Sequence, residues 1–273
     1  MRAVEQQQVV FPKNAAKEEV LLSELALGPH QRFQRRKDRD ARALKLVEAV
    51  PELQQLQFSV LQAATVAGVL YDPDGNIKHE PTKVQLQTTA AIPYYKRAGS
   101  YAKGVKLHTV LERKLIEERN PRRQRQRCCF IAVKPQKPAP VEDGDAAGSV
   151  DLVPMENNGA GTVEAVRPET EEPAGEWIAE LIAWVSYDLP GGKWSEPEAY
   201  VRWFQEDPDG KEESELLEMT RLRVEKDERV NQGGAKVPVD FTDLVKPSRI
   251  MRPVYVLQHP IDKNLRYYNP YAR

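Results

Sequence analysis

The sequence has only two cysteines, Cys128 and Cys129, and they are adjacent. Adjacent cysteines cannot cross-link distant segments, which excludes a disulfide scaffold and favours a reducing compartment. No segment approaches the roughly 20 apolar residues of a transmembrane helix, and the first residues lack an apolar core of signal-peptide length. We therefore expect a cytoplasmic or nuclear protein that is not secreted, that has no membrane partner and that folds by apolar burial.

Motifs for catalysis and metal binding are missing as well. The sequence has no Walker loop, G-x-G-x-x-G, H-E-x-x-H or G-x-S-x-G pattern. The four histidines are scattered and no C-x-x-C pair occurs, so no zinc site is expected. The Asp-Pro-Asp-Gly segments at 72–75 and 207–210 lack the later glycine of a calcium loop and predict type I turns instead. We predict a non-enzymatic protein without cofactor or metal.

Charge is present in both signs but is unevenly distributed. Residues 1–137 hold 25 Lys and Arg against 14 Asp and Glu, whereas residues 138–273 hold 15 against 27. The first part is thus at +11 and the second at -12. Clustered cations favour polyanion binding, although two halves of opposite charge can also neutralise each other within one fold.

Two clusters account for much of the basic charge, and glutamines are interleaved in both. Arginine binds phosphate oxygens through two hydrogen bonds and stacks on bases, so such runs are typical of nucleic-acid contacts. Nuclear import and a solvated helix face are the alternatives. The candidate nucleic-acid-binding residues of the clusters are Arg32, Arg35, Arg36, Lys37, Arg39, Arg42, Arg119, Arg122, Arg123, Arg125 and Arg127.

Between the clusters, tyrosines alternate with cations in the segment PYYKRAGSYAKG. Aromatic rings stack on single-stranded bases while neighbouring cations follow the backbone. Packing of these tyrosines within the fold is an equally good interpretation. The segment adds Tyr94, Tyr95, Lys96, Arg97 and Tyr101 to the candidate nucleic-acid-binding residues.

Apolar spacing predicts both helices and strands in the first part. Helices are expected over residues 14–27, 39–50, 51–67 and 104–119, with Pro51 at a first helical position. Alternation predicts a strand near residues 83–88 after a hairpin turn, and the apolar run at 128–133 predicts a buried strand.

The second part begins with an acidic segment. Residues 135–176 are rich in Pro, Gly and Ala, and ten carboxylates face one arginine from Glu142 onward. This composition predicts an extended, disordered linker. Apolar spacing then predicts two helices over 177–189 and 195–206, a strand at 253–258 and an extended tail.

All four tryptophans lie in the two expected helices or the turn between them. Seven-residue spacing places two of them on one helical face, which suits either the core of a small domain or a surface for a protein partner. The candidate protein-interaction residues are Trp177, Trp184, Trp194 and Trp203.

These features predict an α+β fold in three parts: a basic α+β nucleic-acid-binding region at 1–134, an acidic linker at 135–176 and a mainly helical protein-interaction region at 177–273 with a late strand. The expected function is that of a non-enzymatic RNA- or nucleic-acid-binding assembly protein, such as a component of a ribonucleoprotein particle or a viral nucleoprotein-like structural protein. Such a protein is expected to form oligomers or larger assemblies. The alternative is a protein-interaction adaptor whose basic half binds an acidic partner or an anionic membrane surface.

Overall fold

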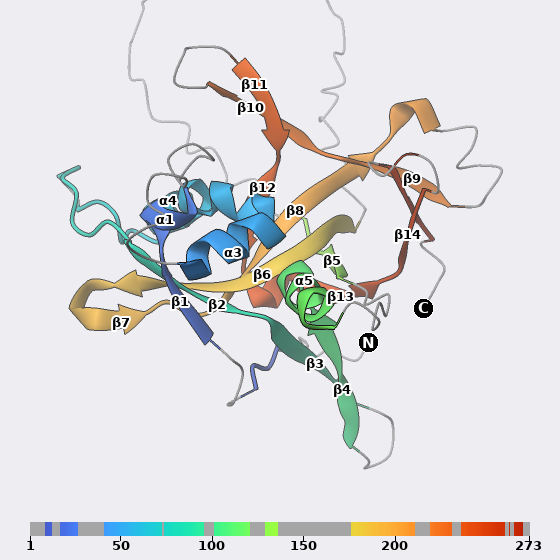
Figure 1. The fold of residues 1–273 in the computed structure, drawn as a ribbon, viewed down its shortest axis with the longest axis horizontal. Coiled ribbons are helices and arrows are strands. Elements are labelled where there is room, and N and C mark those ends of the chain that lie inside the picture. The colour runs from blue at the N-terminus through green and yellow to red at the C-terminus, as the bar shows by residue number, and fades with distance from the viewer. Residues whose placement is uncertain are drawn as a thin grey trace, which may run out of the picture.

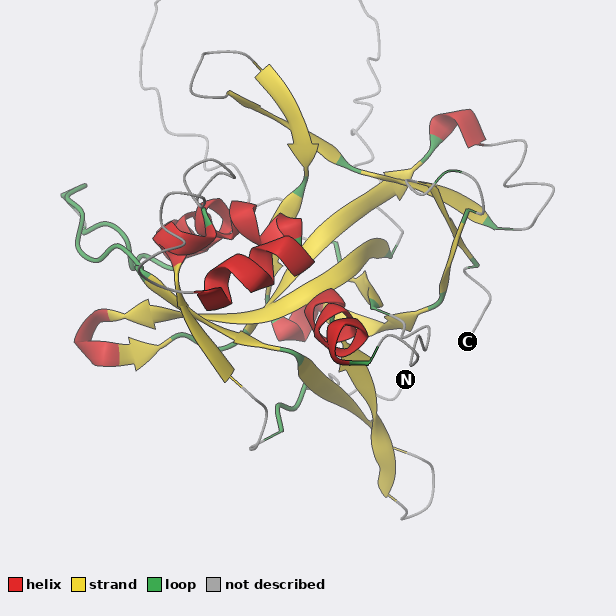
Figure 2. Cartoon of the chain, in the orientation of Figure 1, coloured by secondary structure: helices red, strands yellow, loops and turns green. Residues whose placement is uncertain are grey.

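Antiparallel β-structure dominates the fold (Figures 1 and 2). The computed structural model describes residues 9–12, 17–26, 41–72, 74–95, 101–120, 129–135, 176–210, 219–230, 236–259, 262 and 265–269. Strands make up 48% of the structure, helices 28%, and 11 strands form one sheet. The predicted fold with a mainly helical C-terminal region is wrong: between 176 and 269, the described helical elements are three-residue 3-10 turns.

Two long strands form the centre of the sheet, β6 (Trp177–Leu189) and β8 (Glu198–Glu206). Both were predicted as helices. They pair with each other along one edge, where the short strand β7 (Lys193–Trp194) also pairs with the end of β6. Along its other edge, β6 pairs with β2 (Lys83–Gln87) and β5 (Phe130–Val133), and β8 pairs along its other edge with β9 (Thr220–Val224) and β12 (Thr242–Val245).

The helical spacing of these segments misleads because β6 is covered on both faces. Residues 178–187 are all buried, whereas an amphipathic surface helix keeps one polar face. A strand buried on both faces is apolar without alternation, and periodicity alone does not distinguish it from a helix. A bulge between Leu181 and Ala183 also shifts the strand's alternation by one residue.

The outer strands extend the sheet, and two separate hairpins flank it. The sheet continues through β1 (Lys17–Leu21), β13 (Ile250–Val254), β14 (Val256–Gln258) and β15 (Leu265–Tyr268), while β3 (Thr89–Tyr95) pairs with β4 (Tyr101–His108) and β10 (Lys226–Val230) pairs with β11 (Lys236–Asp240). The strand expected at 253–258 is confirmed as extended structure. The start of the expected extended tail is instead a paired strand, β15.

Helices cover one face of the sheet (Figure 2). The helical elements are α1 (Leu22–Leu25), α3 (Ala41–Ala49), η1 (Pro51–Gln55), α4 (Leu56–Val66) and α5 (Val110–Arg119). The helices expected at 39–50 and 51–67 are confirmed, with Pro51 starting the 3-10 turn η1. Of the helix expected at 104–119, only the part from 110 is helical.

The segment expected to form a helix over 14–27 begins, in its described part, with a strand. Residues 17–21 pair with β2 as β1, and only four residues follow as the helix α1. This pairing buries Val20 and leaves Lys17 and Glu19 exposed. A sheet edge supplied by residues more than 60 positions away thus outweighs the local helix signal.

The opposite face of the sheet packs on the base of the β3–β4 hairpin. Ala90, Ile92 and Leu107 of the hairpin share a buried cluster with Trp184 and Val201 of the central strands. The far end of the hairpin extends away from the rest of the fold (Figure 1). The sheet therefore separates a helical layer from a protruding hairpin.

Both parts of the chain contribute to the same sheet. Strands β2 and β5, which precede residue 135, pair with β6, which follows residue 176. The expected strands at 83–88 and 128–133 are confirmed, and Cys129 is buried. Residues 136–175 of the predicted linker lie outside the described residues.

Both predicted Asp-Pro-Asp-Gly turns are confirmed by their hydrogen bonds. The Gly75 amide donates to the Asp72 carbonyl at 3.0 Å, and the Gly210 amide donates to the Asp207 carbonyl at 3.0 Å. In the described part of the chain, no helix is both long and apolar enough to cross a membrane.

Candidate functional site

Most of the candidate nucleic-acid-binding cations lie outside the described residues. This applies to Arg32, Arg35, Arg36, Lys37, Arg39, Lys96, Arg97, Arg122, Arg123, Arg125 and Arg127. Arg42 lies in the first turn of α3, and Arg119 is exposed in the last turn of α5.

The candidate tyrosines lie in the β3–β4 hairpin. The register pairs Tyr95 of β3 with Tyr101 of β4, and Tyr94 with Ala102. The pairing shifts between Ile92 and Tyr94, which marks a bulge before the outer part of the hairpin. Tyr95 and Tyr101 are thus the last cross-strand pair before the basic connection at 96–100.

Helix α5 is attached to the base of this hairpin. The Thr109 hydroxyl caps the helix by accepting from the Glu112 amide at 3.0 Å, and it donates to the Thr88 carbonyl at 2.9 Å. Glu112 also binds His108, and it accepts from Lys106 at 3.0 Å. Burial raises the pKa of Glu112, but these hydrogen bonds outweigh burial and lower the pKa overall. The second basic cluster therefore continues from a helix that is fixed to the hairpin.

The four tryptophans have different environments. The helical face expected to carry Trp177 and Trp184 does not form, because both residues lie in β6. Trp184 is fully buried and contacts Phe11 edge-on at 5.0 Å between ring centroids. Trp194 is half-buried in β7. Trp177 is 43% exposed and meets the nearly buried Trp203 edge-on at 5.6 Å.

Trp177 and Trp203 line a groove of about 500 Å³ between the start of β6, the end of β8 and strands β9 and β15. Its lining residues are Glu176, Trp177, Ile178, Trp203, Phe204, Gln205, Glu206, Thr220, Leu222, Glu225, Phe241 and Tyr268. Five aromatic rings and three carboxylates are present, and none of these twelve residues is basic. Burial, together with the negative charge of Asp227, raises the pKa of Glu225.

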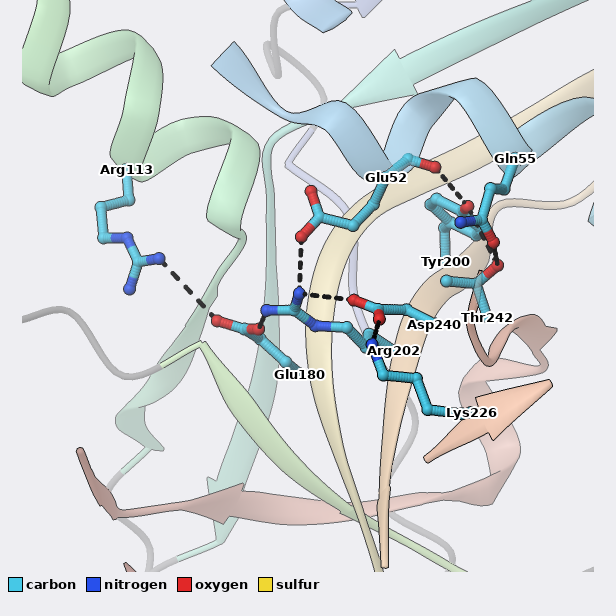
Figure 3. A network of polar contacts seen from close by, with 9 residues as sticks. All are labelled: Glu52, Gln55, Arg113, Glu180, Tyr200, Arg202, Lys226, Asp240 and Thr242. Carbon is cyan, nitrogen blue, oxygen red and sulfur yellow. Dashed lines mark hydrogen bonds and ion pairs between the residues drawn. The ribbon is translucent and has the colours of Figure 1, made fainter. Parts of the chain in front are cut away.

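A second feature is a charge network between the helical layer and the sheet (Figure 3). Arg202 of β8 binds its cross-strand partner Glu180 of β6, which is 3% exposed. The same guanidinium binds Glu52 of η1 at 2.7 Å and Asp240 of β11 at 3.0 Å. Arg113 of α5 lies 3.8 Å from Glu180.

Neutral groups continue the network on one side (Figure 3). The Tyr200 hydroxyl donates to the Glu52 carbonyl at 2.7 Å and lies 3.2 Å from the hydroxyl of Thr242. The Thr242 hydroxyl donates to Gln55 at 3.4 Å. These contacts join η1 to strands β8 and β12.

The charged groups of this network compensate one another, so the network is suited to stabilising the fold. Burial lowers the pKa of Arg202, but the charges of Glu180 and Glu52 outweigh burial, so the guanidinium stays ionised. Glu52, Glu180 and Asp240 each contact Arg202. Among the described residues, no group of three or more His, Cys, Asp or Glu side chains is placed to hold a metal ion.

This network was not predicted from the sequence, although a signal for it was present. Glu180 interrupts the apolar run WIAELIAWV, and Arg202 interrupts the run AYVRWF. A lone charge within an apolar strand requires a buried partner. The two runs therefore indicate a buried ion pair, but they do not identify the other residues of the network.

Replacing Asp240 by asparagine is expected to change the pH dependence of stability. Burial raises the pKa of Asp240, but hydrogen bonds and charges from Lys226 and Arg202 outweigh burial, so the folded pKa is lowered. A lowered pKa stabilises the fold above the unfolded value of about 3.9, and this contribution is lost as the pH falls through the folded value. The stability difference between wild type and Asp240→Asn should therefore be largest near neutral pH and shrink below about pH 4.

Urea unfolding at a series of pH values measures this difference. Asp209→Asn is the matched control, because Asp209 is exposed in the turn at 208–210. Its profile should follow that of wild type. A difference for Asp240→Asn that stays constant from pH 7 to pH 3 would contradict the predicted linkage.

Comparisons with known proteins give no relative: no family model, no curated protein and no solved structure matches this chain.

Proposed function

We propose that this protein is a non-enzymatic RNA- or nucleic-acid-binding assembly protein whose first half contacts the nucleic acid and whose second half contacts protein. The observation that carries the proposal is the β3–β4 hairpin, which extends from the fold and pairs Tyr95 with Tyr101 at its outer end (Figure 1). The connection between these tyrosines contains Lys96 and Arg97. Stacking on tyrosine together with phosphate contacts to neighbouring cations suits single-stranded nucleic acid.

Helix α5 supports the same proposal. It is capped by Thr109 at the base of the hairpin, and its exposed Arg119 precedes the run PRRQRQR at 121–127. Helix α5 therefore links the tyrosine hairpin to the segment of the sequence that carries the second basic cluster. Phosphate contacts from such a cluster provide affinity and little base preference, as an assembly protein requires.

The test is fluorescence anisotropy of the full chain with single-stranded and duplex RNA over a range of salt concentrations. The full chain is needed because both parts contribute strands to one sheet. Reversing the charge of Arg122, Arg123, Arg125 and Arg127 to glutamate should weaken binding at least tenfold. On single strands, the slope of log K against log salt should fall by about 0.7 for each phosphate that the variant no longer binds.

A matched control reverses four exposed lysines of other elements, namely Lys78, Lys193, Lys236 and Lys246. It changes the net charge equally and should weaken binding less. Tyr95→Ala should remove the stacking of one base, about 1–3 kcal/mol, with little change in the salt slope. Unchanged RNA retention after reversal of the arginines would reject the proposal, and retention on anionic vesicles or an acidic protein instead would support the adaptor alternative.

A further inference from the structure

The groove lined by Trp177 and Trp203 has the aromatic lining and the volume of a binding site. The two indole rings are nearly perpendicular, at 88°, and form a corner. Phe204, Phe241 and Tyr268 add further aromatic surface. A volume of about 500 Å³ lies within the range of ligand sites and exceeds the space of a single small ion.

Tyr268 is held in place at one side of the groove. Its hydroxyl donates to Glu176 at 3.0 Å, and it accepts from Arg252 at 2.9 Å. Arg252 also donates to Glu176 at 2.7 Å and 3.2 Å, which neutralises this carboxylate. This wall is therefore formed before any ligand arrives.

The other two carboxylates of the groove differ from Glu176 in their surroundings. Neither Glu206 nor Glu225 contacts a cation within the described part of the chain. Glu225 is half-buried, so its carboxylate has lost part of its hydration. An anion such as a nucleic-acid phosphate is repelled here, whereas a cation is attracted both by the carboxylates and by the faces of the rings.

We propose that this groove binds arginine side chains of a basic segment of a partner protein. A guanidinium is planar, stacks on aromatic rings and donates two parallel hydrogen bonds to a carboxylate. An ammonium group is a compact, strongly hydrated point charge that matches this combination less well. Trp177 provides exposed ring surface, and Glu225 provides the carboxylate.

The inference deepens the protein-interaction part of the proposed function and rests on that part alone. Nucleic-acid binding by the first half is independent of the groove. The RNA and peptide assays can therefore fail separately, and each failure identifies the part that is wrong.

The experiment is isothermal titration of the full chain with a blocked peptide that alternates arginine and glycine, compared with its lysine and citrulline counterparts. The arginine peptide should bind more tightly than the lysine peptide, and the citrulline peptide, which lacks the charge, should show no binding. Trp177→Ala should weaken binding of the arginine peptide about tenfold through loss of the ring contact. Glu225→Gln, which keeps the shape of the side chain, should weaken it to a similar extent.

Two matched controls lie outside the groove lining. Tyr255→Ala removes an aromatic side chain that is 72% exposed, and Glu228→Gln removes an exposed carboxylate of β10. Both should bind the arginine peptide as wild type does, and the groove variants should keep wild-type RNA binding. Equal binding of arginine and citrulline peptides, or equal losses for groove and control variants, would overturn the inference.

Discussion

Arg202→Met is expected to lower the free energy of unfolding by about 3–5 kcal/mol. The substitution keeps an unbranched side chain but removes the cation that Glu180, Glu52 and Asp240 share. Glu180 is 3% exposed and, among the described residues, would keep Arg113 at 3.8 Å and the charge of Arg266 without a close ion pair to replace Arg202. An uncompensated buried carboxylate is the physical cause of the loss, which urea unfolding followed by tryptophan fluorescence measures.

Two further variants show whether burial causes this effect. Lys236→Met breaks an ion pair whose side chains are 73% and 69% exposed, and it should change stability by less than about 1 kcal/mol. Glu180→Leu combined with Arg202→Met should recover much of the loss, because replacement of a buried pair by apolar groups is often close to neutral. A loss below 1 kcal/mol for Arg202→Met would mean that the network is hydrated and contributes little.

Trp184→Ala is expected to lower the free energy of unfolding by a similar amount, about 3–5 kcal/mol. The ring is fully buried between the central strands and the β3–β4 hairpin, and it packs edge-on against Phe11. Its removal leaves a cavity that the surrounding strands fill only in part. Urea unfolding followed by far-ultraviolet circular dichroism avoids dependence on the fluorophore that is removed.

The matched comparison is Trp177→Ala in the same strand. Trp177 is 43% exposed, so its loss should cost less than about 1.5 kcal/mol. Trp184→Phe should also be mild, because it keeps a ring and removes an indole Nε1 that has no hydrogen-bond partner among the described residues. Equal losses for Trp177→Ala and Trp184→Ala would contradict the placement of Trp184 in the core and Trp177 at the groove.

Local signals predicted those parts of the fold that local interactions decide. The helices at 41–49 and 56–66 follow apolar spacing and a proline at the start of η1. The Asp-Pro-Asp-Gly turns follow from the preferences of Asp, Pro and Gly at fixed turn positions. The strand β5 follows from a short apolar run. None of these depends on which distant segment lies beside it.

The central strands depend on their neighbours, and the sequence did not identify them. Residues 177–189 are apolar enough for a buried helix or a buried strand, and pairing with β2, β5 and β8 decides for the strand. The same pairing brings Glu180 beside Arg202 and Trp177 beside Trp203. The network and the groove could therefore not be predicted before the sheet was known.

The sequence by itself determined the charge asymmetry, the basic clusters, the turns and the helices at 41–66, because these are properties of composition or of neighbouring residues. Only the tertiary structure decided that the two oppositely charged parts share a sheet, that Trp184 is core while Trp177 faces a groove, and that Arg202 joins three carboxylates. Strand pairing between residues up to about 120 positions apart imposes these contacts. No local pattern encodes such a partner, since a strand's apolar residues fit any apolar face that the rest of the chain provides.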